Sequence, residues 1–107
     1  MSRVFQGTEL KLNVHIEPIG ELTMDDYHFR VEVICGTFKK QSLTIDKEQA
    51  IRVDGSNYAV CFDTSSLGTG SLKCRITAEI PDSDFEDGYR TEITEVDAGI
   101  DIINTIQ

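Results

Sequence analysis

The stretch that decides the fold class reads Leu10-Lys11-Leu12-Asn13-Val14-His15-Ile16-Glu17. Apolar and polar residues alternate in it without interruption, which is typical of a β-strand with one buried and one solvated face. Pro18 and Gly20 come next, and both interrupt a strand, because proline has no backbone N–H and glycine loosens the backbone. The sequence therefore predicts a strand over 10–17 that ends at a turn.

The same alternation returns further along the chain. Residues 27–35 and 71–80 alternate over their whole length, and Pro81 ends the second segment, which we expect to be a central strand. Residues 38–45 are polar on both faces around the lysine pair 39–40. Lysines discourage pairing with a second molecule, so this segment is predicted to be an edge strand.

The remaining segments complete an all-β pattern. Residues 51–53 and 58–62 flank Asp54-Gly55, a strong signal for a hairpin turn, and residues 89–96 and 99–106 are expected to form two further strands. No segment has helical periodicity of useful length. About seven or eight short strands between turns predict an antiparallel, immunoglobulin-like or fibronectin-like β-sandwich, with a small barrel as the alternative.

The chain has 107 residues, which is the size of one domain, so we expect a single β-sandwich over 1–107 with 1–7 as a flexible N-terminal arm. No run of about 18 apolar residues is present, which argues against a transmembrane segment. The first seven residues become polar too soon for a signal peptide. These features predict a soluble, cytoplasmic protein.

Acidic residues dominate the charge and narrow the partners. With 19 Asp and Glu against 10 Lys and Arg, the formal net charge is −9, which disfavours binding to nucleic acid or to anionic membranes. Nine of the acids lie in residues 79–101, where Arg90 is the single base. This acidic segment is a solvated face, a cation site or a surface matched to a basic partner, and the sequence does not choose among them.

One loop of the acidic segment is the candidate metal site. Its carboxylates, suited to calcium, belong to Asp82, Asp84, Glu86 and Asp87. The loop does not match a helix-loop-helix calcium motif, because Gly88 comes one position late and Ile93 stands where a bidentate glutamate belongs. The alternative is a solvated loop whose aspartates bond to their own backbone, with Phe85 packed inward as an anchor.

No catalytic residue and no cofactor are expected. Cys35, Cys61 and Cys74 form no C-x-x-C pair, so they are expected to be free thiols, with a Cys35–Cys74 disulfide as the alternative. His15 and His28 lie on the polar phase of their strands and are expected at the surface. Because no nucleophile, metal-ligand or cofactor signature accompanies these residues, we predict that the protein is not an enzyme.

A glycine-rich segment, 63–72, is expected to form a corner between two strands. Gly68-Thr69-Gly70 does not make a phosphate-binding loop, because it opens a strand instead of a helix and Lys73 takes the place of a third glycine. Leu67 is expected to pack under the end of the sandwich. The segment is therefore structural.

Three segments carry a resemblance to a known group of proteins. They are 24–29 (Met-Asp-Asp-Tyr-His-Phe), 63–72, and 80–92 (Ile-Pro-Asp-Ser-Asp-Phe-Glu-Asp-Gly-Tyr-Arg-Thr-Glu). The chain resembles, roughly over 7–103, small β-sandwich proteins encoded in prophages and mobile elements of anaerobic gut bacteria. The resemblance implies a virion or assembly component, and it carries over no catalytic residue.

Two functions follow as hypotheses. The first is a non-enzymatic interaction or structural module that binds copies of itself or a neighbouring subunit through a sheet edge or loops. The second is a carbohydrate- or cell-surface-binding module, with calcium as its potential ligand. The second hypothesis lacks large exposed rings, since the chain has no Trp and only 3 Tyr.

Overall fold

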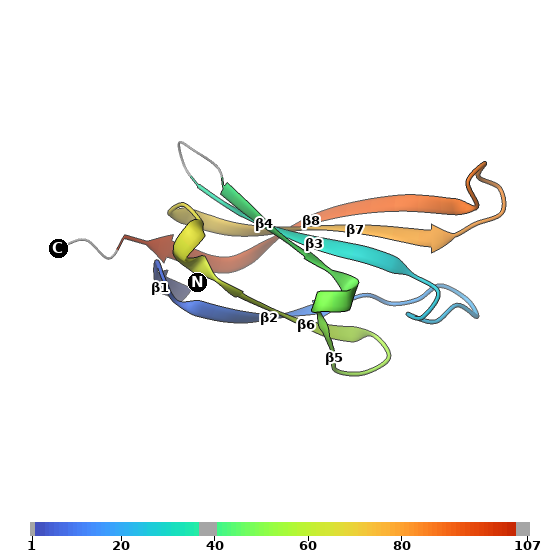
Figure 1. Ribbon diagram of the computed structural model, residues 1–107, viewed down its shortest axis with the longest axis horizontal. Helices are drawn as coiled ribbons and strands as arrows, with labels where there is room; N and C mark the ends of the chain where they lie inside the picture. Colours follow the sequence, from blue (N-terminus) through green and yellow to red (C-terminus); the bar gives the residue numbers. More distant parts are fainter. Residues whose placement is uncertain (1, 37–40, 105–107) are drawn as a thin grey trace.

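Two β-sheets packed face to face make up the computed structural model, which describes residues 2–36 and 41–104 (Figure 1). The larger sheet has the order β1-β8-β7-β3-β4 and the smaller sheet the order β2-β6-β5. The strands are β1 (Ser2–Phe5), β2 (Glu9–His15), β3 (His28–Cys35), β4 (Gln41–Asp46), β5 (Ile51–Arg52), β6 (Asn57–Asp63), β7 (Gly70–Pro81) and β8 (Tyr89–Ile103). Short 3-10 helices follow β4 (η1, Lys47–Gln49) and β6 (η2, Thr64–Ser66). The predicted all-β sandwich is confirmed.

The core lies between the sheets and is built by the alternation in the sequence. On β3, Phe29, Val31, Val33 and Cys35 are buried, and the residues between them face away from the smaller sheet. β7 contributes the buried residues Leu72, Cys74, Ala78 and Ile80. Because β7 pairs with β3 on one side and with β8 on the other, its predicted central position is confirmed.

The predicted edge strand and the predicted hairpin are both present. β4 pairs with β3 and forms one edge of the larger sheet, as the lysine-rich sequence predicted, although residues 38–40 of that prediction lie outside the described residues. β5 and β6 form the predicted hairpin, in which Asp54 Oδ1 accepts hydrogen bonds from the backbone N–H groups of Ser56 and Asn57, both at 2.9 Å. The bond from Ser56, followed by those from Asn57, lowers the pKa of Asp54.

The C-terminal strands differ from the prediction. Instead of two strands over 89–96 and 99–106, one continuous strand, β8, runs from Tyr89 to Ile103, and residues 105–106 of the prediction lie outside the described residues. Its pairing with β7 shifts register between Ser71 and Lys73, at a β-bulge opposite Gly99. Gly99 has a φ of +72°, which residues other than glycine rarely adopt. The bulge accommodates the extra residues of β8. The strand therefore continues past the place where the sequence suggested a break.

The N-terminal segment also differs from the prediction. Residues 2–5, expected as part of a flexible arm, form β1, which pairs in parallel with residues 100–103 of β8. This pair departs from a purely antiparallel sandwich. Val4 packs against the core, and Gln6 Nε2 donates a 2.6 Å hydrogen bond to the carbonyl of Leu67. Pairing and packing together therefore hold β1 in place, although it is too short to be recognised as a strand in the sequence.

The corner between β6 and β7 is tightly built. Leu67 is fully buried, as predicted, and the buried Thr64 Oγ1 donates to the Thr8 carbonyl at 2.7 Å and accepts from the Gly7 N–H at 2.9 Å. Asp63 accepts from the hydroxyl and N–H of Ser65, and these bonds lower the pKa of Asp63. The corner thus anchors the β1–β2 turn as well as the start of β7.

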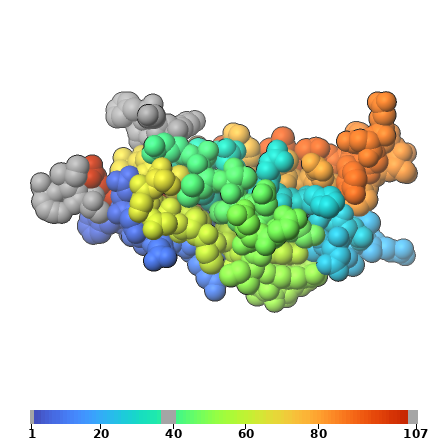
Figure 2. Space-filling view, viewed as in Figure 1, coloured from blue at the N-terminus to red at the C-terminus, as the bar shows by residue number. Residues whose placement is uncertain are grey.

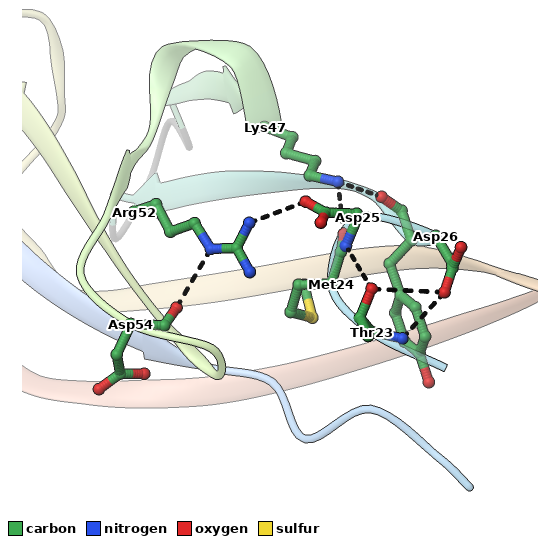
Figure 3. Close-up of polar contacts among 8 residues, drawn as sticks. Thr23, Met24, Asp25, Asp26, Lys47, Arg52 and Asp54 are labelled. Atoms are coloured by element: carbon green, nitrogen blue, oxygen red, sulfur yellow. Dashed lines mark hydrogen bonds and ion pairs between the residues drawn. The ribbon is translucent and has the colours of Figure 1, made fainter. Parts of the chain in front are cut away.

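Two cations, Lys47 on η1 and Arg52 on β5, bind the loop that precedes β3 (Figure 3). Lys47 Nζ donates to the backbone carbonyls of Met24 and Tyr27, at 2.5 and 2.6 Å. Arg52 Nη1 donates to Asp25 Oδ1 at 2.8 Å. The exposed Arg52 pair contributes little, whereas the partly buried ammonium satisfies two carbonyls that β-pairing leaves free. These contacts hold the turn that carries Tyr27.

The molecule is elongated, with principal extents of 55 × 27 × 22 Å. The β7–β8 hairpin extends past the other strands, and its tip and the loop after β2 project as separate prongs at one end (Figure 2). The described residues contain no helix with the length and apolar character needed to cross a bilayer.

Candidate functional site

The strongest candidate site is a groove that opens between the two sheets, along the sides of β2 and β8. Its volume is about 520 Å³. Leu12, Val14 and Ile16 form one wall, and β7 provides the floor with Ile76, Ala78 and Ile80. The other wall consists of β8 residues, namely Glu92, Thr94, Val96 and Ala98. The groove is therefore apolar at its floor and along β2, and polar on much of β8.

The inner end of the groove is closed by Tyr27. Its ring lines the groove and is almost fully buried, and its hydroxyl accepts a 3.0 Å hydrogen bond from the backbone N–H of Ile19. Lys47 Nζ donates a hydrogen bond to the backbone carbonyl of Tyr27. The loop between β2 and β3 is thus held in place by the Tyr27 hydroxyl and the Lys47 ammonium group.

β8 has a long edge without a strand partner in the described part of the chain. β1 covers only residues 100–103 of it, so residues 89–99 have β7 on one side and no strand on the other. The Asp82 N–H bonds to the Gly88 carbonyl, and 82 lies opposite 88 in the β7–β8 register, so even-numbered residues of β8 bond to β7. The carbonyl of Ile103, an odd-numbered residue, accepts from the Gln6 N–H on the β1 side, so it also points away from β7.

The backbone groups of the odd-numbered residues of β8 therefore point to the open edge. Thr91, Ile93, Glu95 and Asp97 each present an N–H and a carbonyl there, whereas the N–H of Tyr89 is bound by Asp87 Oδ1 at 3.1 Å. On the far side of the groove, β2 pairs with β6 alone and is the edge of its own sheet. Two strand edges thus border one apolar groove.

The charge around the open edge is acidic. Arg90, the single base of the acidic segment, is bound to Asp82 at 3.3 Å and to Glu92, and its bond to Glu92, followed by that to Asp82, raises its pKa. Arg75 likewise joins Glu95 at 3.0 Å on the outer face of the sheet. Both arginines are therefore paired with acids already, and the acidic excess remains.

The acidic loop does not gather its carboxylates around one point. Asp82 Oδ1 accepts from the Asp84 N–H at 3.0 Å, and Asp87 Oδ1 accepts from the Tyr89 N–H. In the described residues, no three His, Cys, Asp or Glu side chains, including Asp82, Asp84, Glu86 and Asp87, lie close enough together to hold a metal ion. These bonds are those of the alternative in which the aspartates bond to their own backbone.

Phe85 corrects a prediction about this loop. It was expected to pack inward, but 48% of its surface is exposed. The hairpin tip extends past the other strands (Figure 1), so the ring has no opposite layer to pack against.

The two histidines lie apart at the surface, as predicted. His15, on β2, has Nδ1 3.1 Å from Asn57 Oδ1. His28, on β3, packs its ring 5.7 Å from the ring of Tyr89. They belong to different sheets, so the fold does not bring the two imidazoles together.

The three cysteines are free thiols, as predicted, and differ in exposure. Cys35 and Cys74 are buried, and desolvation raises the pKa of both thiols, whereas Cys61 is exposed on β6. A raised pKa keeps a thiol protonated and unreactive at neutral pH.

We therefore expect one thiol of the folded chain to react rapidly with a maleimide at pH 7, and all three to react in denaturant. Mass spectrometry of the labelled protein counts the adducts. The Cys61→Ser variant, as a control, has no rapidly reacting thiol. Rapid native labelling of Cys35 or Cys74 would contradict the burial of these side chains.

Comparison with known proteins adds no relative. No family model, curated protein or solved structure matches the chain.

The groove and its open edge escaped the sequence analysis, although a signal for them is present. The even residues of β8 point toward the smaller sheet, and three in succession are polar: Arg90, Glu92 and Thr94. A polar run on an inward phase indicates that no opposite layer covers it. That inference needs the register with β7, which the sequence alone left open.

Proposed function

We propose that this protein is a non-enzymatic interaction module that binds an extended protein segment at the open edge of β8, beside the intersheet groove. The observation that carries the proposal is the row of backbone groups on Thr91, Ile93, Glu95 and Asp97, which have no strand partner among the described residues. Such an edge is a template for adding a strand. The apolar floor of the groove lies next to it and can accept alternate side chains of the added segment.

The edge lacks several of the devices that prevent strand addition, although Arg90 and Glu92 are charged residues on its inward phase. Residues 89–97 contain no lysine and no proline, and the bulge lies beyond them, near Gly99. Four of the nine, Thr91, Ile93, Thr94 and Val96, are β-branched residues that favour extended structure. By contrast, the β4 side of the same sheet follows a pair of lysines in the sequence.

The finer class of the sandwich and its biological setting belong to the same proposal. The order β8-β7-β3-β4 facing β2-β6-β5 supports an immunoglobulin-like arrangement. The resemblance to prophage-encoded sandwiches extends the proposal to a virion or assembly component. A carbohydrate site has less support, because Tyr27 and Tyr58 are buried in the core.

The proposal is tested by an NMR titration of the isotope-labelled protein with a synthetic peptide that can add as a strand. The probe is a blocked peptide of about ten residues that alternates lysine and valine, which suits an acidic edge and an apolar groove. We expect NMR shifts of the 91–97 amides and of groove residues, and weaker binding as salt rises.

The matched control peptide alternates glutamate and valine at the same length. It should bind far more weakly, because the edge is acidic. Unchanged amide signals over 89–97 with the lysine peptide, or shifts that fall on β4 instead, would refute binding at this edge.

A further inference from the structure

The edge of β8 has a sequence that complements itself. We propose that β8 pairs in an antiparallel manner with β8 of a second copy of this chain, around a two-fold axis at Ile93. This inference rests on the proposed function and names the partner. Ile93 has 64% of its surface exposed on the outer face of the sheet and lies at the middle of the open edge.

Backbone geometry limits the registers that such a pair can take. Hydrogen-bonded pairs form between residues whose N–H and carbonyl groups both point to the shared edge. On β8 these are the odd-numbered residues, so an odd residue of one copy must face an odd residue of the other. With Ile93 facing Ile93, Thr91 faces Glu95, and both pairs satisfy this requirement.

The register centred on Ile93 also places every acid opposite a hydroxyl. Glu95 faces Thr91, Glu92 faces Thr94, and Asp97 faces Tyr89. Opposed like charges destabilise a strand pair, whereas hydroxyls can donate to carboxylates. Arg90 faces Val96, and the two Ile93 side chains form an apolar cross-strand contact on the outer face.

The neighbouring registers of allowed parity are worse. Centring the pair on residue 92 or on residue 95 places two glutamates directly opposite each other. Centring it on residue 94 sets the exposed Ile93 against Glu95 and removes the apolar contact. The axis at Ile93 is therefore the arrangement that satisfies both charge and packing.

The length of the open edge fits this arrangement. The pair uses residues 89–97 of each copy, and β1 begins opposite Ile100, so it does not obstruct the second copy. The second chain turns away at its own Gly88, just before β8 begins at Tyr89. The axis is perpendicular to the sheet, so the two larger sheets become continuous and the two grooves lie on the same side.

The net charge of the chain predicts how the association depends on salt concentration. Each copy carries a formal charge of −9, so two copies repel at long range, and added salt screens this repulsion. Nine paired residues make a small interface, of the size found in weak, transient complexes. We expect a weak dimer that strengthens with salt, whereas binding of the lysine peptide weakens with salt.

Sedimentation equilibrium of the full chain, at about 0.05 and 0.5 M NaCl, measures this association. We expect Ile93→Lys to weaken it at least about tenfold, because two ammonium groups would meet at the axis. The side chain is exposed, so the variant should fold, which circular dichroism checks. The control is Val53→Lys, at a similarly exposed site in the turn between β5 and β6, which should leave the dimer unchanged.

Cysteine cross-linking tests the register. In a Cys61→Ser background, Ile93→Cys should form a disulfide-linked dimer on mild oxidation with copper–phenanthroline, because opposed residues of a hydrogen-bonded pair have Cα atoms about 5.5 Å apart. Thr91→Cys alone should not cross-link, since the two copies of Thr91 are about four residues apart along the ladder. Mixing Thr91→Cys with Glu95→Cys should restore the cross-link.

A monomer at both salt concentrations up to about 1 mM would overturn the inference, and so would equal cross-linking of Ile93→Cys and Thr91→Cys. If the lysine peptide still binds in that case, the edge is an interaction site for another protein and the proposed function stands. If neither the peptide nor a second copy binds, both proposals are wrong.

Discussion

Replacing Leu67 with alanine is expected to lower the free energy of unfolding by about 2–5 kcal/mol, the range for truncating a buried leucine. Leu67 has no exposed surface and lies just after η2, where the chain passes from one sheet to the other. Its carbonyl also accepts the hydrogen bond from Gln6, so the corner is held on two sides and has little freedom to collapse into the cavity. Urea denaturation measures the change.

The matched control is Val53→Ala, because Val53 has 60% of its surface exposed next to the β5–β6 turn. Its effect should stay within about 0.5 kcal/mol. If the Leu67 and Val53 variants were equally stable, Leu67 would not be part of the core.

The elements that sequence analysis predicted best are those whose burial repeats with period two. β2, β3 and β7 have one face against the opposite sheet, so hydrophobicity alone marks their residues, such as Val31 and Leu72, as inward. The corner at Leu67 was predicted for a related reason. An apolar residue isolated in a polar, glycine-containing loop has few ways to avoid water except by packing under the sandwich.

The elements that were mispredicted depend on pairing between residues far apart in the chain. β1 is too short to show alternation, and it exists because residues 100–103 offer it an edge. The continuity of β8 depends on the bulge at Gly99, which reads as a turn signal in the sequence. Phe85 was expected inside because aromatic residues usually are, and only the projection of the hairpin leaves it exposed.

The candidate site was predictable in its charge and not in its geometry. Counting acids located the acidic segment, but nothing local shows that Glu92 and Thr94 face a groove or that Ile93 and Glu95 border an open edge. Those facts follow from which strands are neighbours. An open edge is the consequence of a strand that is missing at that position. The polar inward phase of β8 signals this edge only once the register with β7 is known.

The second large effect is expected at Thr64, which is fully buried. Its hydroxyl links the Gly7 N–H to the Thr8 carbonyl and so connects the η2 corner with the β1–β2 turn. Gly7 has a φ of +99°, which favours glycine, so the turn has little freedom to move its N–H toward another acceptor. The Thr8 carbonyl keeps a second bond, from the Thr64 N–H, and the Gly7 N–H is the more dependent group.

Thr64→Val keeps the shape of the side chain and removes the hydroxyl, so it should cost about 1–3 kcal/mol, the penalty for a buried donor left without a partner. Thr64→Ser keeps the hydroxyl and removes a methyl group, so its cost should be about 1 kcal/mol. Urea denaturation gives the order, and hydrogen exchange of the Gly7 amide locates the effect, since it should accelerate in the valine variant alone. A serine variant less stable than the valine variant would mean that packing, and not the hydrogen bond, holds this corner.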